Sequence, residues 1–225
     1  MKLYSGPLSL FSRKVEIALH EKGLPFDRLI VAFSQESGYS PKHPDVLAVN
    51  PKGQVPVLVD GELSLYDSTI ILEYLDERVP KAPLFPTGAA ERARCRMLED
   101  LGDTLLAPNL GVLVREVLLK PDASTRDSAA VAQTKAELAR QYQRLERELG
   151  KRDYLCGEFS VADISCFSPI NIASLMEGAP SAELGNLAKW LSRMSKRPSV
   201  ARYLAEFSEA TAPLRAPAQA ASAHA

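Results

Sequence analysis

Cysteine is scarce and scattered in this 225-residue sequence, which contains only Cys95, Cys156 and Cys166. No CxxC pair occurs, and no cysteine and histidine residues have the spacing of metal ligands. We therefore expect neither a disulfide framework nor a metal site. We interpret the three thiols as reduced side chains that serve as small apolar groups, as is usual in a reducing compartment.

Long apolar runs and an excess of charge of either sign are also lacking. No stretch of about 18 apolar residues occurs, and residues 1–7 contain no extended apolar signal core. The 27 basic and 28 acidic side chains leave a formal net charge of −1. We therefore expect a cytoplasmic protein that binds neither membranes nor nucleic acid. With 46% hydrophobic residues, the composition is that of a globular protein and excludes a disordered chain.

The first eighty residues alternate between strand and helix patterns. The pair Asp60-Gly61 separates two strand patterns and is typical of a tight hairpin. Residues 33–53 are rich in serine, proline, glycine and asparagine, so we expect a loop there. The order β-α-β, loop, β-β-α predicts a small α/β domain over residues 1–79. Its strands are expected at 2–5, 27–31, 55–59 and 62–66, and its helices at 12–22 and 67–78.

The pattern becomes wholly helical after a proline-rich stretch. Three prolines predict a linker over residues 80–87. Apolar residues at helical spacing then predict an all-helical domain over residues 88–208, whose first long helix is expected to kink or end at Pro108. Residues 209–225 are rich in alanine and proline with few apolar anchors, and we expect a poorly ordered tail there.

Ser9 lies before the first helix, where thioredoxin-like folds place a CxxC pair. Without cysteines there, dithiol exchange of that kind is excluded, but a serine hydroxyl can donate a hydrogen bond to a bound thiolate. Lowering a thiol pKa by two units requires about 2.7 kcal/mol. One charge-assisted hydrogen bond of roughly 1.5–3 kcal/mol, with the helix dipole, is of that size. A simple helix cap is the alternative interpretation of Ser9.

Two further positions could bind a peptide-like ligand. A cis bond between Val55 and Pro56 would present the Val55 backbone to an extended ligand, although a trans proline at a strand edge is the commoner form. Asp67 and Ser68 precede an apolar helical run, where either is a good N-cap. The free N–H groups of that helix end could hold a carboxylate while Asp67 pairs with an ammonium group.

These motifs, in this order, resemble the cytosolic glutathione S-transferases of the serine type, with a glutathione site like that of the phi, tau and zeta classes. Two runs resemble the signature of that site: NPKGQVPVL at 50–58 and DSTIILEYL at 67–75. Residues 160–163, SVAD, resemble the capping box of the second domain. The resemblance covers about residues 1–207 and implies a thioredoxin-like domain, an all-helical domain and a homodimer.

The resemblance also implies a role for each matching residue in binding glutathione, the co-substrate of the family. In serine-type members the thiolate-stabilising serine lies six residues before the valine of the first helix; Val15 therefore points to Ser9, with Ser5 and Ser12 as rivals. Cysteine-type members carry cysteine where Phe11 stands here, so mixed-disulfide chemistry is disfavoured.

The remaining matches concern the two ends and the middle of glutathione. Val55, beside a cis Pro56, would pair with the cysteinyl backbone. The γ-glutamyl end would be held by Asp67 and Ser68, and the glycyl carboxylate by Lys42 and Gln54.

The function implied is the conjugation of the glutathione thiolate to a small hydrophobic electrophile, as in detoxification. We expect the electrophile pocket between the two domains, formed by the first loop and residues 101–115. The alternatives are a non-catalytic protein of the same fold that binds a protein partner, and a glutathione-dependent isomerase, etherase or dehalogenase.

Overall fold

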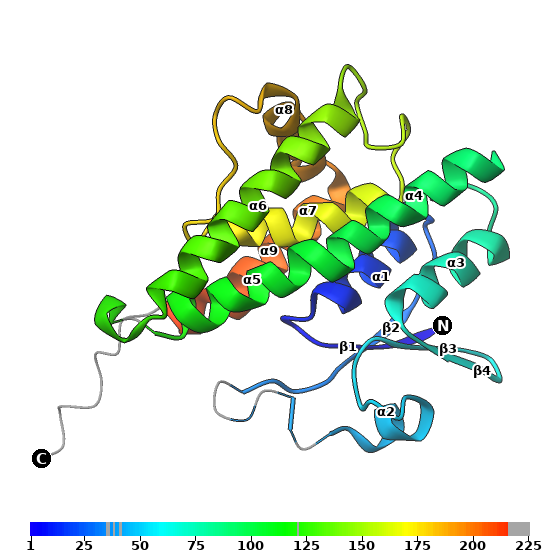
Figure 1. The fold of residues 1–225 in the computed structure, drawn as a ribbon. Coiled ribbons are helices and arrows are strands. Elements are labelled where there is room, and N and C mark those ends of the chain that lie inside the picture. The colour runs from blue at the N-terminus through cyan, green and yellow to red at the C-terminus, as the bar shows by residue number, and fades with distance from the viewer. Residues whose placement is uncertain (35–36, 38, 41, 121, 216–225) are drawn as a thin grey trace, which may run out of the picture.

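A four-stranded mixed sheet forms the N-terminal part of the chain (Figure 1). The computed structural model describes residues 1–34, 37, 39–40, 42–120 and 122–215. The strands lie in the order β2-β1-β3-β4, in which β1 pairs in parallel with β2 and antiparallel with β3, and β3 pairs antiparallel with β4. They are β1 (Lys2–Ser5), β2 (Asp27–Ile30), β3 (Val57–Asp60) and β4 (Leu63–Tyr66).

Helices cover both faces of this sheet. α1 (Leu10–Glu21) and α3 (Ser68–Arg78) lie between the sheet and the helical domain, and α2 (Pro44–Val49) lies on the opposite face (Figure 1). This arrangement confirms the thioredoxin-like fold that the sequence predicts. β3 begins two residues later than expected, because the strand pairing starts at Val57.

Alternation along the strands divides the apolar residues between the two faces. Leu3 pairs with Leu58, and both are buried in the large core beneath α1 and α3. Tyr4 pairs with Val57, and both belong to a smaller cluster that contains Val46 of α2. The expectation of a loop over 33–53 is therefore wrong at α2. A six-residue helix with one buried apolar side chain gives too little periodicity to be recognised.

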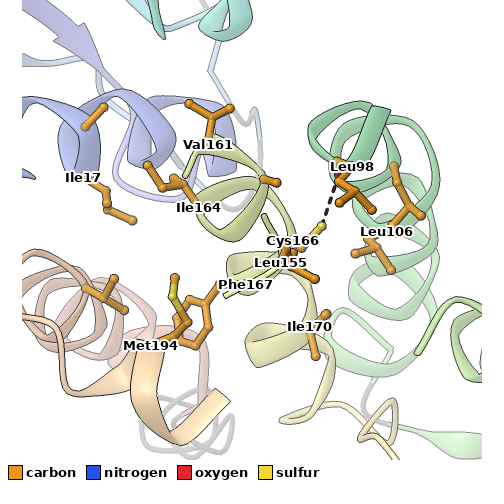
Figure 2. Close-up of a cluster of buried hydrophobic side chains, with 14 of the residues drawn as sticks. Ile17, Leu98, Leu106, Leu155, Val161, Ile164, Cys166, Phe167, Ile170 and Met194 are labelled. Atoms are coloured by element: carbon orange, nitrogen blue, oxygen red, sulfur yellow. Dashed lines mark hydrogen bonds between the residues drawn. The ribbon is translucent and has the colours of Figure 1, made fainter. Parts of the chain in front are cut away.

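The second domain is helical, as predicted, and α7 runs through its centre. α7 is apolar on nearly every side, and Ile164, Phe167 and Ile170 are completely buried. Figure 2 shows these side chains between Leu98 on one side and Met194 on the other. The helices are α4 (Ala89–Leu101), η1 (Gly102–Leu106), α5 (Ala107–Leu113), η2 (Val114–Leu118), η3 (Ala123–Thr125), α6 (Ser128–Leu149), α7 (Val161–Ala173), α8 (Gly185–Ser195) and α9 (Pro198–Arg215).

Pro108 does not end the long helical path from α4 to η2. The π-helical turn η1 precedes it, and Pro108 occupies the first turn of α5, where a missing N–H is tolerated. The wider turn accommodates the proline, so α4 and α5 follow each other in nearly one line (Figure 1).

Helix α9 overlaps the first part of the tail that the sequence analysis expects over residues 209–225. α9 continues to Arg215, so residues 209–215 are helical, and residues 216–225 lie outside the described part of the chain. Thr211 is buried, and its hydroxyl donates to the Phe207 carbonyl oxygen at 2.8 Å. No helix in the described ranges is long and apolar enough to cross a membrane.

Candidate functional site

Two adjoining cavities lie where the α/β domain meets the helical domain. The first has a volume of about 490 Å³, and the second, of about 320 Å³, extends from it to the start of α3. Phe11, Gln54, Val55 and Asp103 line both. All seven residues that the sequence singles out as candidates line one or both cavities: Ser9, Lys42, Gln54, Val55, Pro56, Asp67 and Ser68.

Ser9 is the N-cap of α1 and lines the larger cavity. Its Oγ accepts a hydrogen bond from the backbone N–H of Ser12 at 3.2 Å. A hydroxyl that accepts in this way keeps its own proton for another partner. The unpaired N–H groups of the first helical turn add positive potential beside it. Ser9 can therefore donate to an anion in the cavity.

The two rival serines have different surroundings. Ser5 is completely buried, and its hydroxyl donates to Glu16 Oε1 at 2.5 Å. Ser12 is also completely buried, and its Oγ accepts from the backbone N–H of Gly6 at 3.2 Å. Neither serine lines either cavity. Ser9 is the one serine of the three that a ligand in these cavities can reach.

The peptide bond between Val55 and Pro56 is cis. Val55 lines both cavities and precedes the first paired residue of β3. Its backbone N–H and C=O are therefore outside the β1–β3 ladder and can pair with an extended ligand.

The start of α3 provides a polar end to the smaller cavity. Asp67 is the N-cap, and its Oδ1 accepts from the Thr69 N–H at 3.0 Å. Its φ angle is 75°, in a region that few residues other than glycine adopt. Ser68 is buried as the first helical residue, so its N–H is one of those that the helix leaves unpaired. A carboxylate fits this helix end.

Lys42 and Gln54 line the larger cavity, and Gln54 lines the smaller one as well. A Cβ atom on Gly53, whose φ is +59°, would lie 3.1 Å from Cγ of Lys42, so the glycine permits both the turn and the close approach of the lysine stem. Within the described ranges, Lys42 forms no ion pair. Asn50 Nδ2 donates to the Gln54 carbonyl oxygen at 2.7 Å and holds the turn.

Tyr39 lines the larger cavity and is a residue that the sequence analysis does not identify. Its Oη accepts from the Leu8 N–H at 3.1 Å, and its ring covers Gly6, where a Cβ atom would lie 2.5 Å from Oη. Burial raises the pKa of Tyr39, so the phenol keeps its proton. A single aromatic residue in a polar stretch has no periodicity that would predict its position. The only indication in the sequence is Gly6, whose lack of a side chain allows another side chain to pack against it.

Asp103, on the π-helical turn η1, is the charged residue that the helical domain contributes to both cavities. Its Oδ2 lies 2.6 Å from Nζ of the buried Lys14, and its Oδ1 accepts from the Ser165 hydroxyl at 2.7 Å. The carboxylate is therefore fixed and partly neutralised. The sequence analysis expects pocket residues over 101–115 but does not single out this one.

An apolar cavity of about 290 Å³ extends from the larger one along the helical domain. It shares Leu8, Leu10, Tyr39 and Ala107 with that cavity. Its other lining residues are mostly apolar and include Leu110, Val114, Ile172, Met176 and Phe207. No group of three metal-binding side chains occurs in the part of the chain that the structure describes. The site therefore combines polar groups for an extended polar ligand with an apolar space beside them.

Comparisons with known proteins agree with this geometry. Residues 3–83 match the model of the glutathione S-transferase N-terminal domain, and residues 106–198 match that of the C-terminal domain. Glutathione S-transferase 3 of Zea mays is 36% identical over 167 residues, which are 72% of this chain and 73% of the maize protein. A stringent starvation protein A homolog of Coxiella burnetii is 44% identical over 98 residues, which are 44% of each protein.

A solved structure extends the similarity to the arrangement in space. The theta class glutathione S-transferase of Xanthomonas axonopodis pv. citri, solved with glutathione bound, is 28% identical to this chain. The alignment covers 89% of this chain and 95% of that one, with a TM-score of 0.77. The comparisons therefore match both domains of the chain, in the same order. The chain belongs to the glutathione S-transferase family.

Proposed function

We propose that this protein is a glutathione S-transferase that joins the thiolate of glutathione to a small apolar electrophile. The observation that carries the proposal is the position of Ser9, which lines the cavity between the two domains and whose hydroxyl donates to no residue in the described part of the chain. The polar residues around it suit a tripeptide, and the adjoining apolar cavity suits the second substrate.

In this proposal the ends of glutathione are held by complementary charges. The unpaired N–H groups at the start of α3 and the Ser68 hydroxyl hold the γ-glutamyl carboxylate, while Asp67 pairs with the ammonium group. The Val55 backbone pairs with the cysteinyl residue. Lys42 and Gln54 hold the glycyl carboxylate. These contacts place the sulfur beside Ser9.

The chemical step is then nucleophilic attack by sulfur. Ser9 donates a hydrogen bond to the thiolate, which lowers the thiol pKa and keeps the nucleophile ionised at neutral pH. The sulfur attacks an electrophilic carbon held in the apolar cavity. A C–S bond forms, and the leaving group departs with the electron pair of the bond that breaks. Closeness and orientation of the two substrates supply the rest of the acceleration.

A second candidate function is a non-catalytic protein that binds a protein partner. We keep this candidate because the name of the Coxiella burnetii relative is not that of a transferase. A glutathione-dependent isomerase, etherase or dehalogenase is a third. An isomerase would turn over substrate without net consumption of glutathione, which separates it from a transferase.

The first experiment is a calorimetric titration with reduced glutathione, together with a measurement of the thiolate absorbance of the complex at about 240 nm. The control ligand is S-methylglutathione, which keeps both ends of the tripeptide but cannot form a thiolate. Binding of both, with absorbance only for glutathione, supports the transferase. Binding without thiolate at neutral pH contradicts the role of Ser9. Absence of binding at millimolar glutathione favours the protein-binding candidate.

We also propose that the protein is a cytoplasmic homodimer, as the resemblance implies. Sedimentation velocity at micromolar concentration is expected to give a single species of twice the chain mass. A monomer over the whole concentration range contradicts the proposal.

A further inference from the structure

Glycine interrupts the long helical path from α4 to η2 at two positions, Gly102 in η1 and Gly111 in α5. Glycine is a poor helix former, so a glycine inside a helix usually has a packing or functional reason. A Cβ atom at Gly102 would lie 2.7 Å from the carbonyl carbon of Ser165, which is closer than packed atoms tolerate. Gly102 therefore permits the close packing of η1 against α7.

Gly111 has no such packing reason. Apart from its own helix and chain neighbours, a Cβ atom there would have no atom of the described residues within 4 Å. The backbone of Gly111 does not adopt the positive φ that favours glycine. Alanine would therefore fit the same backbone, and the fold does not need the space that the missing side chain leaves.

The space at Gly111 belongs to the apolar cavity of about 290 Å³, which this residue lines. Ala107, Val114 and Leu118 line the same cavity. They lie four residues before Gly111 and three and seven residues after it, a spacing that places all four residues on one face of the helical path. A side chain at position 111 would project from the middle of this face.

The volume and the lining of the apolar cavity define the group that fits it. About 150 Å³ is enough to hold one benzene molecule in a protein interior, so a cavity of about 290 Å³ has room for two fused aromatic rings. None of the described residues that line it is charged, and its two hydroxyl groups, of Tyr39 and Thr211, already take part in hydrogen bonds. A charged group would lose its hydration there without gaining a partner, so the group that fits is neutral.

We propose that Gly111 is a specificity-determining residue, which lets the apolar cavity take an electrophile with a neutral bicyclic aromatic group. This inference rests on the proposed function, in which the electrophile becomes bonded to the sulfur of glutathione. The apolar cavity and the larger cavity share four lining residues, so a group on the sulfur can extend from one into the other. Gly111 lines neither cavity of the glutathione site, so a side chain there would shorten the space for the electrophile alone.

The test measures the binding of two S-substituted glutathiones by calorimetry. S-methylglutathione fills the glutathione site alone, and S-(1-naphthylmethyl)glutathione adds the bicyclic group. We expect the second to bind the unsubstituted protein at least about tenfold more tightly, because each buried methylene-sized group contributes roughly fourfold. In Gly111→Leu, the naphthylmethyl compound should lose about tenfold or more, since two excluded ring carbons cost roughly fourfold each. S-methylglutathione should keep its affinity, and Gly111→Ala should show a smaller loss of the same kind.

The matched control is Gly185→Leu at the start of α8. A Cβ atom at this helical glycine also meets nothing within 4 Å, and Gly185 lines none of the three cavities. This variant should bind both compounds as the unsubstituted protein does. If Gly111→Leu binds the naphthylmethyl compound with unchanged affinity, or loses affinity equally for both compounds, the inference is overturned and the proposed function stands. If the unsubstituted protein does not bind S-methylglutathione, the proposed function is overturned and this inference with it.

Urea denaturation tests separately whether the fold needs Gly111. We expect Gly111→Ala to raise the urea midpoint, because alanine is the better helix former and its Cβ atom would meet open space. Gly102→Ala should lower the midpoint, because its Cβ atom would collide with α7. A lower midpoint in Gly111→Ala would show that this glycine serves the fold, which would overturn the assignment.

Discussion

The hydroxyl of Ser9 accepts one hydrogen bond and donates none to the residues that the structure describes. The Ser12 N–H donates to it and fixes its position at the start of α1. The hydroxyl can therefore serve as a donor of defined direction, with little freedom to lose when a thiolate arrives.

Replacing Ser9 by alanine tests this donor. We expect Ser9→Ala to lower kcat/KM by about 10- to 150-fold, because one charge-assisted hydrogen bond of roughly 1.5–3 kcal/mol is lost in the transition state. The affinity for glutathione should change much less. The measurement is steady-state kinetics with an activated aryl halide, beside calorimetry. Ser9→Thr, which keeps a hydroxyl, serves as the rescue variant. Full activity in Ser9→Ala would refute the role.

Ser68 acts on binding in our proposal. We expect Ser68→Ala to weaken glutathione binding about tenfold, the equivalent of roughly 1.4 kcal/mol, because the hydroxyl contact with the γ-glutamyl carboxylate disappears. Calorimetric titration measures this. The control is Ser64→Ala on β4, an exposed position outside the cavities. Equal affinities of the two variants would show that the Ser68 hydroxyl does not contact the ligand.

Candidate residues at the starts of helices could be located from local sequence, and residues that reach the cavities through tertiary packing could not. The roles assigned to them stay predictions. Ser9 and Ser68 lie at helix starts, which the apolar spacing locates. Tyr39 reaches the site because its chain segment folds back over Gly6. Asp103 reaches the cavities because the helical domain packs against the α/β domain. No local sequence pattern predicts the position of Tyr39 or of Asp103.

At the scale of the elements, α7 depends on the carboxylate at its first turn. Asp163 Oδ2 accepts from the Ser160 N–H and hydroxyl, both at 3.0 Å. Its Oδ1 accepts from the Leu155 N–H at 2.9 Å and from Trp190 Nε1 at 2.8 Å. Burial raises the pKa of Asp163 to about 6, so the group is ionised at neutral pH. One side chain thus joins the turn before α7, α7 itself and α8.

The substitution Asp163→Asn tests how much this junction contributes. We expect the free energy of unfolding to fall by about 3 kcal/mol, because an amide nitrogen would face buried donors and the charge would be lost. Urea denaturation followed by the fluorescence of Trp190 measures it. Asp127→Asn, at the exposed N-cap of α6, is the matched control and should cost under about 0.5 kcal/mol, since asparagine caps as well as aspartate. Similar losses in both variants would contradict the junction.

Element prediction succeeded where periodicity was long and failed where it was short or interrupted. The pair Asp60-Gly61 and the apolar spacing of α6 mark their elements clearly. α2 is too short to show a period, and Pro108 suggests a break that the π-helical turn η1 avoids. The helical residues 209–215 have few apolar side chains, so no apolar spacing predicts the end of α9.

At the scale of the whole molecule, a buried cation joins the two domains. Nζ of Lys14, on α1, lies 2.9 Å from Oε1 of Glu99 and 2.6 Å from Oδ2 of Asp103, both in the helical domain. Thr69 of α3 donates to the same Glu99 oxygen at 2.9 Å. The two domains and the two cavities that Asp103 lines therefore share one polar network.

Removing the Lys14 side chain should lower the stability of both domains together. We expect Lys14→Ala to lower the free energy of unfolding by about 3–5 kcal/mol, because two carboxylates are left unpaired. Circular dichroism and the fluorescence of the single tryptophan, Trp190, should report the same urea midpoint. The control Lys135→Ala, at an exposed pair with Glu177, should cost under about 0.5 kcal/mol. Separate midpoints for the two probes would show that the domains unfold independently.

The walls of the larger cavity come from both domains, with Ser9 on one side and Asp103 and Pro108 on the other. A ligand that touches both walls acts as a reversible cross-link between them. Ligand binding and the packing of the two domains are then coupled. The factor by which the ligand stabilises the packed domains equals the factor by which domain packing raises the affinity for the ligand, so a loosened interface lowers that affinity. Substitutions of residues that do not themselves line the cavity, such as Lys14→Ala, become affinity variants as well as stability variants.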